Sequence, residues 1–578
     1  MAFSLLIPVE TALAQDKSRP EGRSTPEAAS QVREDQKTVV QSKVWMAVTA
    51  NPLASQAAAD VLTRGGSAVD AAIAAQMVLN VVEPQSSGIG GGGFLLHYEA
   101  RGKRVTSYDG RETAPAAATP ERFLKPDGQP MGFFEALVGG RSVGVPGLVA
   151  LLGLAHAEHG QLPWAELFEP AIRLAREGFR VSPRLAGLIA RDKHLGTFET
   201  TRALFYHPDG TPLKQGQILK NETLARVFTT IAEQGPGAFY TGWIAEDIVR
   251  HVTSARQQPG DLTLDDLAAY KATKREPVCG FYRGSRVCGM GPPSSGATTV
   301  LQILGLLEAF PPDALKPGTL GRAHLLSEAG KLAFADRGAY LGDADFVEVP
   351  VEEMLARDYL ADRSKLIDPT KAMEKARPGL DQDRAEAEVL ARGLSTTHLS
   401  IVDSEGNAVA MTTSIENAFG SRLVSNGFLL NNQLTDFAFR PRDDAGILRA
   451  NAVAPNKRPR SSMAPTLVLD EKGTLIAATG SPGGSSIIGY VAGSLSLILD
   501  HGFDPQAAVN AGHVVNRNGP TDLEQGTEAE ALQPGLEALG HKTRVRPMTS
   551  GLHIILHRGG ILSGGADPRR EGLAIGGD

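Results

Sequence analysis

Small and aliphatic residues recur at helical spacing through most of the first half of the chain. The clearest stretch is residues 53–82, where the pattern is broken once, at Gly65 and Gly66. We therefore predict a helical hairpin with a closely packed, alanine-lined interface. The same spacing predicts helices at residues 149–156, 164–177 and 320–341. Between them, strand-like runs lie at residues 94–98 and 104–109.

The pattern changes after residue 396. Short runs rich in Val, Ile and Thr now alternate with turns containing Gly, Asp and Asn, which is typical of strands. The predicted strands are residues 397–402, 407–413, 427–430, 466–469 and 475–479. The second half should therefore be rich in strands, and the first half mainly helical.

The N-terminus lacks the apolar side chains that a core needs. Residues 1–15 hold a short apolar run followed by Ala12-Leu13-Ala14, which indicates an export signal. No basic residue precedes the apolar run, so the signal would be incomplete, and an unstructured terminus is the alternative. Residues 16–42 are polar and charged and are expected to form a disordered tether. The folded body should begin near Val44, which leaves residues 1–42 outside it.

A second polar segment separates the two halves. Residues 370–393 are dense in Lys, Asp, Glu and Arg, and we expect them to be exposed and flexible. This linker runs directly into a buried-type strand at residues 395–400. Such a junction is unusual in a chain that stays intact, but it is natural if the strand becomes a new N-terminus.

Length, composition and net charge exclude some classes of function. The 578 residues, 42% of them hydrophobic, can form one large unit or two intertwined ones. The net charge of -7 is modest, and no long basic run is present, so nucleic acid is not an expected partner. No apolar run reaches the roughly 18 residues that a membrane helix needs, so no stable membrane span is expected.

Candidate metal and cofactor motifs fail on their context. Gly88, Gly90 and Gly93 have dinucleotide-loop spacing, but a strand-like run follows where a helix is needed, so we predict a tight glycine loop instead. His156 and His159 have metal-ligand spacing without an evident third ligand, and we interpret them as a helix end. We therefore expect no metal and no cofactor.

The two cysteines, Cys279 and Cys288, flank a segment that looks like a hairpin. They can form a cross-strand disulfide if the protein is exported. Two unpaired thiols in adjacent strands remain an equal alternative, because a disulfide needs the sulfurs to lie close together.

The most informative stretch is STTHLSIVD at residues 395–403, followed by GNAVAMTT at 406–413. From the residues alone it is two strands joined by a Glu-Gly-Asn turn, and Thr396 is an ordinary strand threonine. Other ordered motifs accompany it. They are GIGGGGF at 88–94, DGRETAP at 109–115, GVPG at 144–147, PPSSG at 292–296, GFLLNNQLTDF at 427–437, KRPRSSMAPT at 457–466, GSPGGS at 480–485 and DPRREG at 567–572.

Together these motifs resemble the gamma-glutamyltransferase family from about residue 44 to the end. The resemblance implies an α+β fold, the four-layer αββα sandwich of N-terminal-nucleophile hydrolases. It also implies that the precursor cuts itself between Ser395 and Thr396. Residues 43–395 would become a large subunit and residues 396–578 a strand-rich small subunit, and the two chains would stay interlocked.

The resemblance also assigns the chemistry. Thr396 is the nucleophile, and its freed α-amine, which titrates near neutral pH, is the general base. Ser414 stands where many members have a threonine that supports the nucleophile. Gly483 and Gly484 match the two backbone N–H groups that stabilise the oxyanion.

Five further positions match a pocket for a free amino-acid end, and a sixth departs from the family pattern. Arg111, Ser461 and Ser462 correspond to the groups that hold the carboxylate, and Gln433 and Asp436 to those that receive the ammonium. Glu416 replaces the asparagine that contacts the ammonium in many members and adds a negative charge. The segment of residues 437–455 is also shorter than the loop that covers the pocket in many members.

The implied activity is transfer of a gamma-glutamyl group from glutathione-like donors to water, amino acids or peptides. The enzyme would be periplasmic or secreted. One alternative is an acylase on the same fold, of the cephalosporin or glutaryl type, because fold and nucleophile do not fix the substrate. Another is an uncleaved, inactive relative that acts as an exported binding protein.

Overall fold

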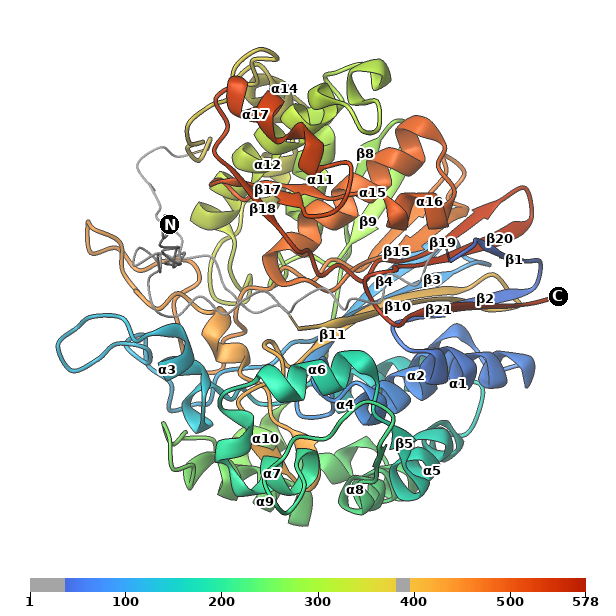
Figure 1. Ribbon diagram of the computed structural model, residues 1–578, viewed down its shortest axis with the longest axis vertical. Helices are drawn as coiled ribbons and strands as arrows, with labels where there is room; N and C mark the ends of the chain where they lie inside the picture. The colour runs from blue at the N-terminus through green and yellow to red at the C-terminus, as the bar shows by residue number, and fades with distance from the viewer. Residues whose placement is uncertain (1–36, 381–394) are drawn as a thin grey trace, which may run out of the picture.

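The computed structural model describes residues 37–380 and 395–578. Within these ranges, two seven-stranded antiparallel sheets lie face to face between two layers of helices (Figure 1). This is the predicted α+β four-layer arrangement. The first sheet has the order β1-β20-β19-β15-β14-β9-β8 and the second the order β21-β2-β10-β11-β3-β4-β7.

The strands of the first sheet are β1 (Val40–Ser42), β8 (Val278–Tyr282), β9 (Ser285–Gly289), β14 (Thr466–Leu469), β15 (Leu475–Thr479), β19 (His553–Arg558) and β20 (Ile561–Ala566). Those of the second are β2 (Trp45–Thr49), β3 (Gly92–Glu99), β4 (Arg104–Gly110), β7 (Thr273–Arg275), β10 (Thr397–Val402), β11 (Ala408–Ser414) and β21 (Leu573–Gly577). Apolar side chains from both sheets, including Met46, Leu96, Leu467 and Ile555, fill the space between them.

Helices of the first half cover the second sheet. They are α1 (Pro52–Thr63), α2 (Ala68–Val82), α4 (Leu148–His159), α5 (Glu169–Glu177), α6 (Pro183–Arg191), α7 (Glu199–Phe205), α8 (Glu222–Gln234), α9 (Gly242–Thr253) and α10 (Leu264–Ala269). The other layer contains α11 (Gly296–Leu307), α12 (Leu320–Tyr340), α13 (Val351–Leu355), α14 (Arg357–Ser364), α15 (Ile487–His501), α16 (Pro505–Asn510) and α17 (Gln533–Ala538). The short helix α3 (Phe133–Leu137) lies to the side (Figure 1).

The predicted helical hairpin is α1 and α2. Asn51 and Ser67 cap their N-termini with side-chain hydrogen bonds, and Asp70 completes a capping box with Ser67. The chain turns at Gly65, whose φ of +83° favours glycine. A Cβ on Gly66 would lie 2.6 Å from a Val61 methyl group, so the close packing of the turn also depends on glycine.

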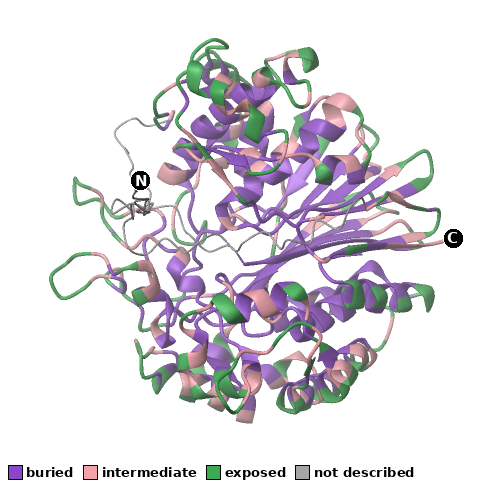
Figure 2. Cartoon of the chain, viewed as in Figure 1, coloured by how far each residue is buried: buried purple, intermediate pink, exposed green. Residues whose placement is uncertain are grey.

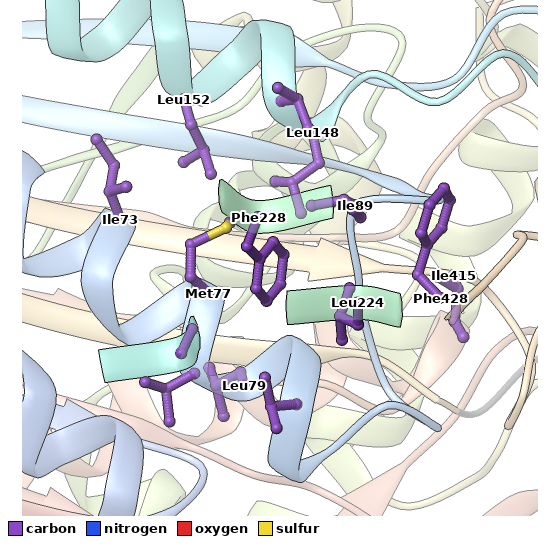
Figure 3. Close-up of a cluster of buried hydrophobic side chains, with 14 of the residues drawn as sticks. Ile73, Met77, Leu79, Ile89, Leu148, Leu152, Leu224, Phe228, Ile415 and Phe428 are labelled. Atoms are coloured by element: carbon purple, nitrogen blue, oxygen red, sulfur yellow. The ribbon is translucent and has the colours of Figure 1, made fainter. Parts of the chain in front are cut away.

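The hairpin supplies much of the larger core. Ile73 and Met77 of α2 pack with Leu148 of α4 and Phe228 of α8 (Figure 3). Ile415, which follows β11, joins the same cluster, so the end of that strand is fixed by apolar packing. Burial runs through the sheets and their inner helices, whereas exposed residues collect on the outer helices and loops (Figure 2).

Ordered structure begins earlier than the sequence suggested. Val40–Ser42 forms β1, which pairs with β20, and the Lys37 ammonium donates a 2.6 Å hydrogen bond to the Gly572 carbonyl. Assigning residues 37–42 to the tether is therefore wrong, because backbone pairing at a sheet edge needs few apolar side chains. The export signal and the rest of the tether, residues 1–36, lie outside the described residues.

The start of the charged linker is also anchored rather than free. The Met373 N–H donates to Glu328, and Ala376 exchanges two hydrogen bonds with Asn518. Both partners are buried or half-buried parts of the body. Residues 381–393, where the prediction of flexibility continues, lie outside the described residues.

Cys279 and Cys288 face each other across β8 and β9 and form a disulfide, with their Cα atoms 4.1 Å apart. This decides the alternative that the sequence left open. None of the helices in the described residues is long and apolar enough to cross a membrane.

Candidate active site

Thr396 directly precedes β10, a central strand between β2 and β11. Its residue is 4% exposed, and its Oγ1 lies 3.0 Å from the Ser414 Oγ at the end of β11. The same Oγ1 hydrogen-bonds to the carbonyl oxygen of Ser395, and the Ser414 hydroxyl donates to that carbonyl over 2.9 Å. The predicted nucleophile, its supporting hydroxyl and the predicted cleavage bond therefore meet at one point.

Two further hydrogen bonds hold Ser395 in place. Its N–H donates to the Glu416 carbonyl over 3.1 Å, and its hydroxyl donates to the Gln85 carbonyl over 2.7 Å. Gln85 follows α2, and its carbonyl also accepts a hydrogen bond from the Phe419 N–H. The peptide that precedes Thr396 thus has a fixed orientation.

His398 is the nearest histidine along the chain, but its ring is engaged elsewhere. Nδ1 pairs with Thr412 Oγ1 at 2.8 Å and Nε2 with Ser400 Oγ at 3.1 Å. Burial lowers the pKa of His398 well below its usual value, so the ring is neutral. His398 therefore positions β10 and is not available as a base for Thr396.

Gly483 and Gly484 lie in the loop between β15 and α15, at φ +127° and +58°. A Cβ on Gly483 would lie 2.6 Å from the Tyr490 ring, so a side chain is excluded there. The loop starts at Gly480, which packs against the ring of His398. His398 is two residues after Thr396 in the chain. In the described part of the chain, neither glycine N–H has a hydrogen-bond acceptor. Two free N–H groups at a helix N-terminus suit a developing negative charge.

Arg111, Gln433 and Asp436 are brought into direct contact. Asp436 Oδ2 accepts from Arg111 Nη2 at 2.5 Å and from Gln433 Nε2 at 2.8 Å. The Arg111 side chain is 1% exposed, and its Nε and Nη2 also donate to the carbonyls of Pro459 and Arg460. This leaves Nη1, which lies 3.7 Å from Glu112 Oε2.

Glu416 extends this acidic region toward Thr396. Its Oε2 accepts a 2.5 Å hydrogen bond from Asn432 Nδ2, while its own N–H donates to Ser414 Oγ. Burial, and then the negative charge of Asp436, raise the pKa of Glu416 to about 8. Its φ of +76° is rare for a residue with a side chain, which indicates that surrounding contacts impose its conformation.

Ser461 and Ser462 are less directly connected. The Ser461 hydroxyl accepts from the Met463 N–H over 3.1 Å, and the Ser462 hydroxyl accepts from Arg337 Nη2 over 2.8 Å. Both serines directly follow the Pro459 and Arg460 carbonyls that hold Arg111. They therefore adjoin the Arg111 guanidinium through the backbone, but their hydroxyls make no hydrogen bond with it.

The chain matches the family model described as gamma-glutamyltranspeptidase over residues 54–577. It belongs to the gamma-glutamyltranspeptidase family.

Relatives in this family carry two kinds of name. The chain is 39% identical over 551 residues to the glutathione hydrolase proenzyme of Escherichia coli strain K12, covering 93% of this chain and 92% of the relative. It is 35% identical over 548 residues to the acylase ACY 1 proenzyme of Pseudomonas sp. strain SE83, covering 92% and 93%. The chain is accordingly an enzyme of the hydrolase and transferase type that is made as a precursor.

Solved structures of the family share the fold. The cephalosporin acylase from Bacillus halodurans superposes with a TM-score of 0.81 at 27% identity, covering 97% of this chain and 99% of that chain. Helicobacter pylori gamma-glutamyltranspeptidase gives a TM-score of 0.56 at 34% identity, covering 60% and 98%. These likenesses confirm the N-terminal-nucleophile hydrolase fold.

Three polar residues of the candidate site were not predicted from the sequence. Gln85 holds Ser395 by its backbone carbonyl, which no side-chain pattern reveals. Asn432 holds Glu416, and its place in the Asn-Asn-Gln run was the available signal. Glu112 is fully buried beside Arg111, and burial raises its pKa to about 8 although the Arg111 charge opposes this.

One cluster in the described residues has the composition of a metal site. His324, Glu328 and His541 are all buried with ligand atoms close together. However, the Lys331 ammonium donates a 2.8 Å hydrogen bond to Glu328 Oε1 and lies 3.5 Å from His541 Nδ1. The protein therefore already supplies the cation of the cluster from its own chain.

Proposed function

We propose that the protein is a gamma-glutamyltransferase and glutathione hydrolase that cuts its own chain between Ser395 and Thr396. Thr396 would then cleave the gamma-glutamyl amide of glutathione-like donors and pass the acyl group to water, amino acids or peptides. The main support for this proposal is that the Thr396 hydroxyl contacts both Ser414 Oγ and the Ser395 carbonyl. Residues 43–395 and 396–578 would be the two subunits.

In self-cleavage, Thr396 Oγ1 attacks the carbonyl carbon of Ser395. The Ser414 hydroxyl already donates to that carbonyl oxygen and stabilises its developing charge. The carbon–nitrogen bond breaks, the hydroxyl proton passes to the nitrogen, and an ester links Ser395 to Oγ1. Water then opens the ester, which leaves a carboxylate on Ser395 and a free hydroxyl and α-amine on Thr396.

The two products would stay together because their strands interleave. β10 and β11 follow the cleavage bond, whereas their outer neighbours β2 and β3 precede it. Cutting one peptide bond therefore removes no pairing of the sheet.

In turnover, the Thr396 α-amine takes the proton of Oγ1, because His398 is not free to do so. Oγ1 attacks the donor amide, the Gly483 and Gly484 N–H groups stabilise the oxyanion, and the leaving amine takes the proton. Water or an acceptor amine then attacks the acyl-enzyme and regenerates Thr396.

Pocket charges fit a donor that carries both a carboxylate and an ammonium. Arg111 Nη1, with the Ser461 and Ser462 segment beside it, would receive the carboxylate. Asp436 and Glu416 would receive the ammonium. Among the described residues, the buried Oε1 of Gln433 accepts no hydrogen bond, which suits it to a third contact with that ammonium.

An acylase is the second candidate, because acylases are among the relatives. The two carboxyl groups next to Gln433 favour the gamma-glutamyl reading, since a glutaryl group differs from it only by lacking the ammonium. We expect gamma-glutamyl-4-nitroanilide to be preferred over glutaryl-4-nitroanilide by about a hundredfold in kcat/KM. Equal rates, or a preference for the glutaryl compound, would assign the protein to the acylases.

Glu416 should make donor binding depend on pH. Its pKa of about 8 lies above the ordinary 4.5, so the free folded protein keeps this carboxyl protonated at neutral pH. An ammonium bound beside it favours the ionised form, so binding releases a proton. We expect KM for the gamma-glutamyl anilide to fall severalfold between about pH 6 and pH 8 in the wild type. Because Gln cannot ionise, this fall should be weaker in Glu416→Gln.

Thermal stability tests the same assignment of Glu416. A carboxyl whose folded pKa is raised contributes stability below its unfolded pKa, and this contribution is lost as pH rises through the folded pKa. Glu416→Gln should therefore melt at a higher temperature than the wild type near pH 8 and at a similar one near pH 5. The same pH slope of KM and melting temperature in both proteins would refute the role of Glu416.

We also propose a periplasmic or secreted location. The disulfide between Cys279 and Cys288 supports it, because disulfides persist mainly in oxidising compartments.

A further inference from the structure

Three arginines surround one buried aspartate close to the glycine pair. Asp522 lies on β17 (Thr521–Glu524), and its side chain is 1% exposed. Its carboxylate accepts hydrogen bonds from Arg517 Nη2 at 3.2 Å, Arg544 Nε at 2.6 Å and Arg546 Nη2 at 2.9 Å. Arg544 and Arg546 lie on β18 (Thr543–Arg546), which pairs with β17 in parallel. One negative charge thus faces three positive charges.

The cluster is partly exposed, and its arginines are incompletely bonded. The Arg544 side chain is 42% exposed and that of Arg517 15%. In the described part of the chain, the buried Nε of Arg546 has no hydrogen-bond acceptor. Burial, with the charges of Arg546 and Arg544, lowers the pKa of Arg517 despite the opposing effect of Asp522. An added anion would relieve this repulsion.

The cluster is joined directly to the loop that carries Gly483 and Gly484. Arg517 Nη1 donates a 2.7 Å hydrogen bond to the hydroxyl of Ser485, the residue after Gly484. Gly484 is therefore directly adjacent in the chain to a residue in contact with the cluster. A chain of two residues spans at most about 7 Å, so a dipeptide leaving the acyl carbon has a comparable reach.

We propose that Arg517, Arg544 and Arg546 form a subsite for the terminal carboxylate of the peptide that leaves, or the amino acid or peptide that enters, at the acyl carbon. This inference rests on the proposed function and specifies its leaving-group and acceptor class. A guanidinium cluster suits a carboxylate because each fork presents paired N–H donors. The acceptors that compete best with water would then be those with a free carboxylate.

The test uses two gamma-glutamyl dipeptide donors that differ only in ending with a carboxylate or a carboxamide. We expect the wild type to favour the carboxylate donor about fivefold in kcat/KM, as for a partly exposed ion pair. The variant Arg517→Gln/Arg544→Gln should lose this preference through a higher KM for the carboxylate donor, with the carboxamide donor unchanged. Raising the ionic strength should reduce the wild-type preference in the same direction.

Arg558→Gln is the matched control. Arg558 donates to the Ile498 and Gly502 carbonyls at the other end of α15, so its removal should leave the preference intact. Single Arg544→Gln, at the most exposed of the three arginines, gives a variant that disturbs the fold least. Cleavage into two chains reports that each variant has folded.

The outcomes separate two failures. If the double variant lowers kcat equally for both donors, or changes neither, the subsite is wrong while the proposed function stands. If the wild type cleaves neither donor, the proposed function is wrong, and the subsite falls with it.

Discussion

Thr396→Ala is expected to remain a single uncut chain and to lose at least about a thousandfold in amidase activity. The change removes the only atom of residue 396 that can attack the Ser395 carbonyl, and it is an atom that already contacts that carbonyl. Denaturing electrophoresis after prolonged incubation measures the cleavage, and hydrolysis of gamma-glutamyl-4-nitroanilide measures the activity.

Thr397→Val is the matched control for this experiment. Thr397 is the next residue, also a buried threonine, and its hydroxyl has no hydrogen-bond partner among the described residues. Valine keeps its shape, so this variant should be cleaved and active. If Thr396→Ala still produced two chains, or if N-terminal sequencing of the wild-type small chain began elsewhere, the nucleophile would be misassigned.

Arg111→Gln should lower kcat/KM for gamma-glutamyl-4-nitroanilide by about two to three orders of magnitude. The change removes the Nη1 donor assigned to the donor carboxylate and leaves Asp436 without its ion-pair partner. Loss of one partner of a buried pair typically costs about 3–5 kcal/mol. A 4-aminobutyryl anilide lacks the α-carboxylate and should lose much less. Arg111→Lys should be intermediate, because it keeps the charge but not the fork.

Arg122→Gln controls for the loss of a buried arginine. The Arg122 side chain is 6% exposed and pairs with Asp261 through two hydrogen bonds, neither partner being a pocket residue. It should affect stability but not the ratio of the two donors. Equal losses for both donors in Arg111→Gln would mean that this arginine only supports the pocket.

The local pattern of apolar and turn residues predicted helices and strands correctly where a segment is both regular and buried. β10, β14 and β15 have the bounds predicted from alternation and turn residues. The α1 and α2 hairpin was predicted because its alanine periodicity and its Gly65-Gly66 break are both local signals. β1 was missed because three residues at a sheet edge carry no such periodicity.

The site residues were predicted from sequence motifs and not from periodicity. The ordered motifs between residues 88 and 572 predicted the family and the candidate residues, although Thr396 alone has the appearance of an ordinary strand threonine. They did not predict that Asp436 would hold Arg111, 325 residues away along the chain. Nor did they predict that the two would leave a single free guanidinium nitrogen facing Glu112.

The sequence by itself determined the mainly helical first half, the strand-rich second half, the family, and the identity of the proposed nucleophile, because these depend on local spacing and on ordered motifs. Only the tertiary structure decided the Cys279 to Cys288 disulfide, the hydrogen bonds that fix Ser395, and the acidic surroundings of Glu416. Each of these depends on side chains or backbone from segments far apart, and their distances are set by how the layers pack.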